Sequence, residues 1–183
     1  LNGICPICGI QQVSTLDHYL PKSDFPTLSV TPYNLIPACR DCNYNKHEIV
    51  IDDPLKTFVH LYNDIIPNVP WLFVDLLDNL EAKYYISCPT CEPRLQGRLE
   101  QHLDNYKLHK LYSSHAASEI ADKRVLWKRL VTCTEPEDGL KLVIEEECKS
   151  AEQNNVNSWR AALYRGLKSN LDKVKTYLSS QSI

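Results

Sequence analysis

The chain has 183 residues, a formal net charge of −3 and 43% hydrophobic residues. This composition is typical of a folded globular protein and excludes a largely disordered chain, while the mild acidity excludes a protein that coats nucleic acid through its overall charge. There is no run of about 18 apolar residues that would span a membrane, and no basic-then-apolar signal segment opens the chain. We therefore expect a cytoplasmic protein that does not enter the membrane.

The eight cysteines are informative through their spacing. Six of them form C-x-x-C pairs: Cys5 with Cys8, Cys39 with Cys42, and Cys88 with Cys91. In a chain without a signal segment, such pairs indicate metal ligands rather than a disulfide framework. The first two pairs predict a tetrahedral four-thiolate zinc site. For the third pair two interpretations stay open: a second metal site completed by Cys133, Cys148 or His102, or buried free thiols.

The first fifty residues carry four of the cysteines and five of the prolines, with little long hydrophobic periodicity. A segment of this kind buries too little apolar surface to fold unaided, and a zinc ion would stabilise it. The pattern predicts a short strand over residues 13–20 and an irregular loop over 21–32. A second strand is expected at Leu35-Ile36, followed by a helix from Cys39 towards Glu48.

From residue 52 onward the pattern becomes helical. Asp52-Asp53-Pro54 predicts a helix start, because proline at an early helical position loses no hydrogen bond. A strand or hairpin is expected near residues 83–87, and the apolar residues of 94–132 are sufficient for two helices. Basic residues outnumber acidic ones in 93–129 and in 158–183, which predicts either solvated helix faces or a basic face for DNA or a partner.

Two further helices are expected in the last third of the chain. Thr134 and Glu137 resemble a capping box before a helix that ends at Glu145–Glu147. Apolar residues then recur every three or four positions from Trp159 to Leu178. This periodicity predicts a single terminal helix with Asn157 as its cap.

A set of motifs in the first fifty residues resembles the HNH endonuclease family in its zinc-stapled form. The family pattern runs C-x-x-C, D-H-x-x-P, N-L and C-x-x-C-(H/N)-x-x-K. Each element is present in order: Cys5 to Cys8, Asp17 to Pro21, Asn34-Leu35 and Cys39 to Lys46. The resemblance covers residues 4–47 and implies a treble-clef-like ββα-metal unit, which agrees with the strands and helix predicted there.

The resemblance also implies roles for individual residues. His18 would be the general base that takes a proton from the attacking water, since imidazole titrates near neutral pH. Asp17 and Asn43 would hold a catalytic Mg²⁺ or Mn²⁺ through oxygen atoms, and that ion would neutralise charge on the phosphate. Asn34 would brace the loop that orients His18. Cys5, Cys8, Cys39 and Cys42 would hold the structural Zn²⁺.

Several neighbouring residues extend this predicted site. Lys22, Arg40 and Lys46 are placed to contact DNA phosphates. Asn43 stands where many family members have histidine, and its amide oxygen favours Mg²⁺ or Mn²⁺ over softer ions. His47 follows Asn43 by four positions, so it is either an additional ligand on the same helix face or a solvent-facing helix end.

We therefore expect an α+β protein: a small ββα-metal module over residues 1–50, followed by a predominantly helical domain over 51–183. The resemblance implies a DNA endonuclease that leaves 3′-hydroxyl and 5′-phosphate ends, with a place in restriction or phage defence, sometimes beside an ATPase subunit. An alternative stays open, namely a zinc-stabilised nucleic-acid-binding or scaffold subunit that is inactive without a partner protein. The near-neutral charge of residues 1–50 keeps this alternative open, because it gives little electrostatic grip on DNA.

Overall fold

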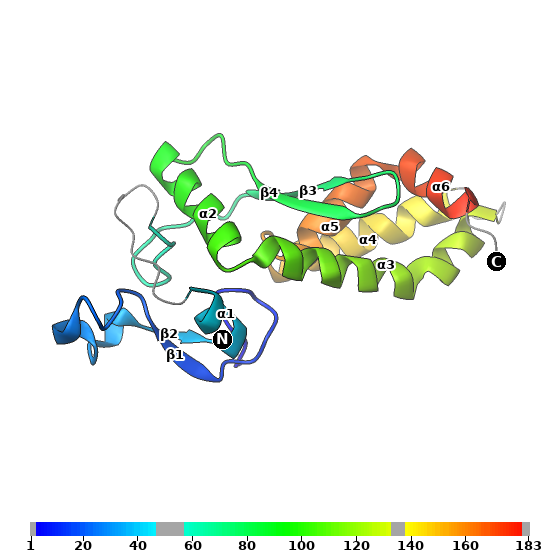
Figure 1. Ribbon diagram of the computed structural model, residues 1–183. Helices are drawn as coiled ribbons and strands as arrows, with labels where there is room; N and C mark the ends of the chain where they lie inside the picture. Colours follow the sequence, from blue (N-terminus) through cyan, green and yellow to red (C-terminus); the bar gives the residue numbers. More distant parts are fainter. Residues whose placement is uncertain (1–2, 47–56, 133–137, 181–183) are drawn as a thin grey trace. The chain divides into compact units, whose positions relative to one another are not determined.

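The computed structural model describes residues 3–46, 57–132 and 138–180 (Figure 1). The chain forms two compact units: unit 1 comprises Leu1–Pro67 and Thr90–Leu108, and unit 2 comprises Asn68–Pro89 and His109–Ile183. The α+β class is confirmed, with two small antiparallel hairpins and a majority of helix. The units divide the chain differently from the expected boundary at residue 50, because unit 1 takes in a later segment of the chain.

Unit 1 contains the ββα arrangement expected from the motifs. Strand β1 (Thr15–His18) pairs antiparallel with β2 (Leu35–Ala38), so that His18 faces Leu35 across the hairpin. The connection between them carries two short 3₁₀ turns, η1 (Pro26–Leu28) and η2 (Pro32–Asn34), and helix α1 (Arg40–Lys46) follows β2 directly. The predicted strand, loop, strand and helix are thus confirmed in order.

The second segment of unit 1 is helix α2 (Pro93–Asn105), which begins with a proline in its first turn and buries Leu99 and Leu103. Arg98 lies on this helix and donates hydrogen bonds to the Phe58 carbonyl (2.6 Å) and to the Tyr19 hydroxyl (3.2 Å). It also forms an ion pair with Asp64 at 2.6 Å. These contacts make α2 part of the unit that carries the HNH motifs.

Unit 2 combines the hairpin of β3 (Leu72–Leu76) and β4 (Ala82–Ile86) with four helices: α3 (Leu108–Thr132), α4 (Gly139–Asn154), α5 (Trp159–Ser169) and α6 (Leu171–Ser180). Helix α5 packs against both α4 and β3 (Figure 1). A glycine allows the close approach of α5 to β3, since a side chain at Gly166 would collide with Val74. Trp127 and Tyr164 are fully buried in the core of this unit.

Three expectations for this region are wrong. The terminal periodic stretch forms two helices, α5 and α6, which are separated at Asn170. The cap of α5 is Ser158, whose side chain accepts from the Ala161 amide, because the Asn157 side chain is engaged with the β3 strand start. Asn157 accepts from two backbone amides of that segment, 2.7 and 3.2 Å away. Helix α4 also continues beyond Glu147 to Asn154, since Cys148 and Ala151 extend its buried face.

The third C-x-x-C pair departs from both interpretations offered for it. Cys88 and Cys91 form a disulfide around a short turn, so they are neither free thiols nor metal ligands in this structure. Cys148 is a buried thiol on α4. The predictions that concern Cys133, the Thr134–Glu137 capping box and the Asp52–Pro54 helix start lie outside the described residues. Within the described part of the chain, no helix is both long and apolar enough to cross a membrane.

Candidate active site

The four cysteines of the first two pairs gather into one buried cluster. The sulfur atoms of Cys5, Cys8, Cys39 and Cys42 all lie within 4.8 Å of one another. The Gly9 amide donates to the Cys5 carbonyl at 2.8 Å, and Gly9 adopts a positive φ of 67°, which closes a tight turn after the first pair. The sequence thus brings two distant C-x-x-C turns into a set of ligands that can hold a metal such as zinc.

The electrostatics of this cluster favour a bound cation. A hydrogen bond from the Cys42 thiol is the main cause that lowers the pKa of Cys5. The pKa of Cys42 is raised in turn, mainly because Cys42 gives its hydrogen bond to Cys5, with burial adding to the effect. The thiols therefore cannot all ionise together by themselves, whereas a divalent cation at their centre would allow it.

Asp17 is a buried carboxylate at the end of β1. Strand alternation places Leu16 outward, 55% exposed, and Asp17 inward, 6% exposed. One carboxylate oxygen, Oδ1, accepts from the Lys46 ammonium at 3.1 Å, and Lys46 donates in addition to the His18 carbonyl. The second oxygen, Oδ2, is buried with no hydrogen-bond donor among the described residues. Asp17 therefore keeps one oxygen for a further cationic partner.

Burial governs the charge state of this pair. Desolvation raises the pKa of Asp17 above its ordinary value, although the Lys46 ammonium opposes the shift. Desolvation likewise lowers the pKa of Lys46, against the effect of Asp17. Each charge is thus costly to bury and is held in place by the other.

Among the described residues, one hydrogen bond orients the ring of His18. Its Nε2 lies 2.9 Å from the carbonyl oxygen of Ser29. Because a carbonyl can only accept, Nε2 must carry the hydrogen, and the neutral ring then has its lone pair on Nδ1. Nδ1 is consequently the atom of His18 that can take a proton.

Asn34 ties together the two ends of the β1–β2 connection. Its side-chain oxygen accepts from the Leu20 amide at 2.7 Å, and its side-chain nitrogen donates to the carbonyls of Leu20 and Leu28 at 3.1 Å each. The Asn34 carbonyl also accepts from the Tyr19 amide at 2.8 Å. Asn34 thereby fixes the loop that presents the Ser29 carbonyl to His18.

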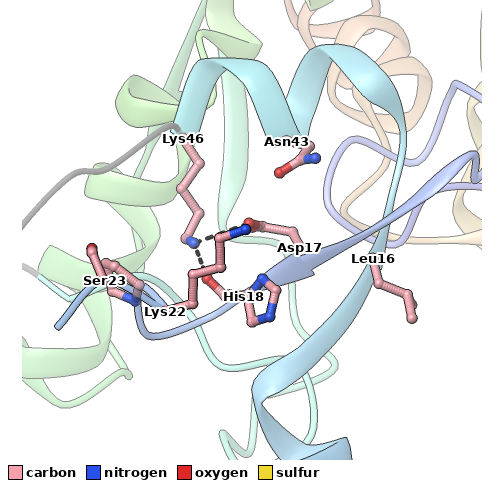
Figure 2. Close-up of a pocket in the computed structure, with 8 residues that line it drawn as sticks. Leu16, Asp17, His18, Lys22, Ser23, Asn43 and Lys46 are labelled. Carbon is pink, nitrogen blue, oxygen red and sulfur yellow. Dashed lines mark hydrogen bonds and ion pairs between the residues drawn. The ribbon is translucent and has the colours of Figure 1, made fainter. Parts of the chain in front are cut away.

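Asn43 reaches the same region from α1. Its Nδ2 donates to the Thr15 hydroxyl at 3.3 Å, so the amide oxygen is the atom that could coordinate a cation. Figure 2 shows Asn43 and Asp17 facing one another across the hollow between α1 and β1, with the His18 ring beside them. A carboxylate oxygen without a donor and an amide oxygen form a hard donor pair that suits Mg²⁺ or Mn²⁺.

These side chains line one pocket of about 370 Å³. Its lining residues come from β1, from the start of the loop and from α1: Leu16, Asp17, His18, Pro21, Lys22, Ser23, Asn43 and Lys46. Asn34 is not among them and acts through the loop instead. Asp17, His18 and Asn43 therefore line the same pocket.

The three residues predicted to contact DNA phosphates, Lys22, Arg40 and Lys46, differ in their exposure and in their position relative to the pocket. Lys22 is exposed and lines the pocket, and Arg40 is exposed at the start of α1 outside the pocket lining. Lys46 is 2% exposed and pairs with Asp17, so its ammonium faces the carboxylate rather than solvent. The proposed extra ligand His47 lies outside the described residues.

Sequence reasoning did not predict that residues of α2 support the hairpin: Arg98 was not singled out, and His102 was considered only as a ligand of a second metal site. Arg98 donates to the Tyr19 hydroxyl and to the Phe58 carbonyl, and His102 Nε2 lies 3.1 Å from the carbonyl of Ile7, which stands between Cys5 and Cys8. These partners are separated from α2 by 40 to 95 residues. No local spacing in the sequence signals such contacts.

Comparison with known proteins agrees with the motif analysis. Residues 5–48 match the HNH endonuclease family model. A segment of 91 residues is 35% identical to Protein ea31 of Escherichia phage lambda, covering 46% of this chain and 31% of the phage protein. The chain thus spans under a third of that relative's length. No solved structure matches the chain.

Proposed function

From the premise that residues 5–48 are an HNH endonuclease domain, we propose that the chain hydrolyses phosphodiester bonds of DNA in a metal-dependent reaction. The observation that carries this proposal is the convergence of Asp17, His18 and Asn43 on one pocket. The pocket joins a proton acceptor to two oxygen donors, which is the minimal set for activating water beside a cation.

In this mechanism His18 is the general base. Its Nδ1 takes a proton from the water that attacks phosphorus, while the Ser29 carbonyl accepts from Nε2 and holds the ring in orientation. The resulting imidazolium still donates from Nε2 to the Ser29 carbonyl, and this hydrogen bond stabilises its positive charge. Asn34 is a positioning residue, since it fixes the loop that carries Ser29.

Asp17 and Asn43 would hold the divalent ion, Mg²⁺ or Mn²⁺, through Oδ2 and the amide oxygen. When bound, this ion supplies positive charge to the phosphate and to the leaving oxygen. Lys22 is the exposed cation at the pocket, so it is placed to orient a neighbouring phosphate. The products would be a 3′-hydroxyl and a 5′-phosphate.

A second candidate function is supported by the pairing of Lys46 with Asp17. An ammonium already neutralises that carboxylate, so the site is charge-balanced as it stands. The chain could accordingly be a zinc-stabilised subunit that binds DNA and cleaves only with a partner, such as an ATPase subunit. A role in restriction or phage defence belongs to the nuclease proposal.

Cleavage of supercoiled plasmid by the zinc-loaded full chain tests the proposal. We expect nicking or linearisation with Mg²⁺ or Mn²⁺, none without added divalent ion, and loss of cleavage in His18→Ala. His115→Ala is the matched control, because this histidine lies in unit 2, and it should cleave like the native chain. Zinc content measured for each sample shows that the cysteine cluster is intact. DNA binding without cleavage by the native chain would instead favour the second candidate.

A further inference from the structure

Four aromatic rings of unit 1 form a continuous row that starts beside the candidate general base. The centroids of Tyr19 and His60 lie 4.3 Å apart, those of His60 and Tyr62 6.0 Å, and those of Tyr62 and Tyr33 6.2 Å. We call these four residues the aromatic row. Exposure increases along it, from the partly buried Tyr19 to Tyr62 at 48% and Tyr33 at 67%. The far end of the row therefore presents aromatic surface to solvent.

Hydrogen bonds fix the row to the catalytic hairpin. The Tyr19 hydroxyl donates to the Phe58 carbonyl at 2.9 Å. The Tyr62 hydroxyl donates to the Leu35 carbonyl at 3.1 Å, and Leu35 is the residue that faces His18 across the two strands. The inner end of the row, Tyr19, is thus tied to the segment of Phe58, and Tyr62 is tied to the strand residue opposite His18.

The order of residues in the chain also connects the aromatic row with His18 and its loop. Tyr19 directly follows His18, and Tyr33 directly precedes Asn34, which fixes the loop of His18. A substrate strand whose phosphate enters the pocket would consequently have its neighbouring nucleotides near this surface. The two end members of the row are thus sequence neighbours of residues that form or brace the proposed active site, although none of the four rings lines the pocket itself.

The chemistry of such a surface suits nucleobases. Aromatic side chains stack with bases of any sequence, because every base has a π-face. In a duplex those faces are already covered by neighbouring base pairs, so only an unpaired base can use the surface. A purely structural role would bury these rings, which does not agree with the exposure of Tyr33 and Tyr62.

We propose that the aromatic row binds unpaired bases next to the scissile phosphate, so that the preferred substrate is DNA with a single-stranded segment at the cleavage site. This inference rests on the proposed nuclease function, whose substrate class it defines. The outer rings of Tyr33 and Tyr62 stack with bases, and the hydroxyl of Tyr62 holds its ring against Leu35. Lys22 at the pocket contacts the backbone of the same strand.

Binding measurements without catalysis test the proposal independently of cleavage. The zinc-loaded full chain is titrated, with no added divalent ion, into a fluorescent single-stranded oligonucleotide and into the duplex of the same sequence. We expect tighter binding to the single strand. We also expect quenching of a 2-aminopurine base in that strand, since stacking on a ring quenches its fluorescence.

Two substitutions at one position separate the ring from its hydroxyl. Tyr33→Leu removes the ring and keeps apolar bulk, so binding to the single strand should weaken about 5- to 150-fold, the equivalent of one lost base stack. Tyr33→Phe keeps the ring and should bind like the native chain. Tyr44→Leu is the matched control, because Tyr44 is 77% exposed on α1 and stands outside the row, and its binding should be unchanged.

The outcomes are distinct. Equal affinity for single strand and duplex, or a Tyr33→Leu variant that binds like Tyr44→Leu, overturns the proposal. Loss in Tyr33→Phe equal to that in Tyr33→Leu also overturns it, because the hydroxyl rather than the ring would then be responsible. If the single strand binds and quenches as expected but the native chain fails to cleave with Mg²⁺, the nuclease function fails while the base-binding surface stands.

Discussion

Replacing Lys46 by methionine would remove one charge from a buried pair while keeping a chain of similar length. The Lys46 and Asp17 side chains are 3% and 8% exposed, and their charged atoms lie 3.1 Å apart. Removing one partner of such a pair leaves an uncompensated charge inside the protein, which costs about 3–5 kcal/mol. We therefore expect Lys46→Met to lower the free energy of unfolding by about 3 kcal/mol near neutral pH.

The pH dependence of this loss has a definite sign. Burial already raises the pKa of Asp17 in the folded state, and without Lys46 nothing in the pair opposes that shift. A raised folded pKa means that ionising Asp17 costs stability, so the deficit of Lys46→Met should grow as pH rises above about 4, the pKa of an unfolded aspartate. It should level off above the folded pKa and become small in acid, where Asp17 is protonated in both states.

Adding Mg²⁺ to the same unfolding experiment tests whether Asp17 binds a divalent ion. A ligand that binds only the folded state at about 100 times its Kd stabilises it by about 2.7 kcal/mol. Because Lys46→Met carries no ammonium to compete for Asp17, Mg²⁺ should stabilise this variant more than the native chain. Urea unfolding of the zinc-loaded full chain, with and without Mg²⁺, measures both effects.

Lys175→Met is the matched control for this experiment. Lys175 forms an ion pair with Asp138 at 2.9 Å, but both groups are solvent-exposed, so its loss should change stability little and should not alter the response to Mg²⁺. If Lys46→Met unfolded like Lys175→Met, the buried pair would not hold the charges described here. If Mg²⁺ left both variants and the native chain unchanged, Asp17 would not be a divalent-ion ligand.

Three other substitutions have defined outcomes. Cys39→Ser should abolish stoichiometric zinc and lower the melting temperature of unit 1, and a fully retained metal content would contradict the four-thiolate site. Arg98→Met should destabilise the protein by about 2–3 kcal/mol in urea unfolding, because the Phe58 carbonyl and Asp64 lose a charged donor, whereas the exposed Arg124→Met should not. Gly166→Ala should cost about 1–3 kcal/mol through its collision with Val74; an unchanged denaturation midpoint would refute that contact.

The sequence predicted those parts of the fold whose signals lie close together in the chain. The C-x-x-C pairs, the Asp17-His18 dipeptide and the short apolar runs around them define the ββα region locally, and the number of apolar residues over 94–132 predicted the two helices α2 and α3. Strand alternation requires Leu16 and Asp17 to face opposite sides, but it does not determine that the carboxylate faces inward, where it pairs with Lys46.

Other features depend on contacts between distant residues and carry no local signal. Asn157 is an acceptable helix cap by residue type, yet its side-chain oxygen accepts hydrogen bonds from backbone amides 85 and 86 residues away. Ser158 is the cap of α5 instead. Lys46 fits a phosphate contact by position, yet burial turns it towards Asp17. The break between α5 and α6 at Asn170 interrupts a stripe whose periodicity continues without change.

The discontinuous path of the chain has a consequence for how this protein can be divided. Because unit 1 consists of Leu1–Pro67 and Thr90–Leu108, no single cut releases it whole, and a fragment trimmed to the family motif would lack Arg98. A protease cut within Asn68–Pro89 would still leave the two pieces of unit 1 joined by the contacts of Arg98 with Phe58 and Asp64. The compact unit that contains the candidate active site therefore consists of two separate segments of the chain, and a contiguous fragment that includes both must also carry the intervening Asn68–Pro89.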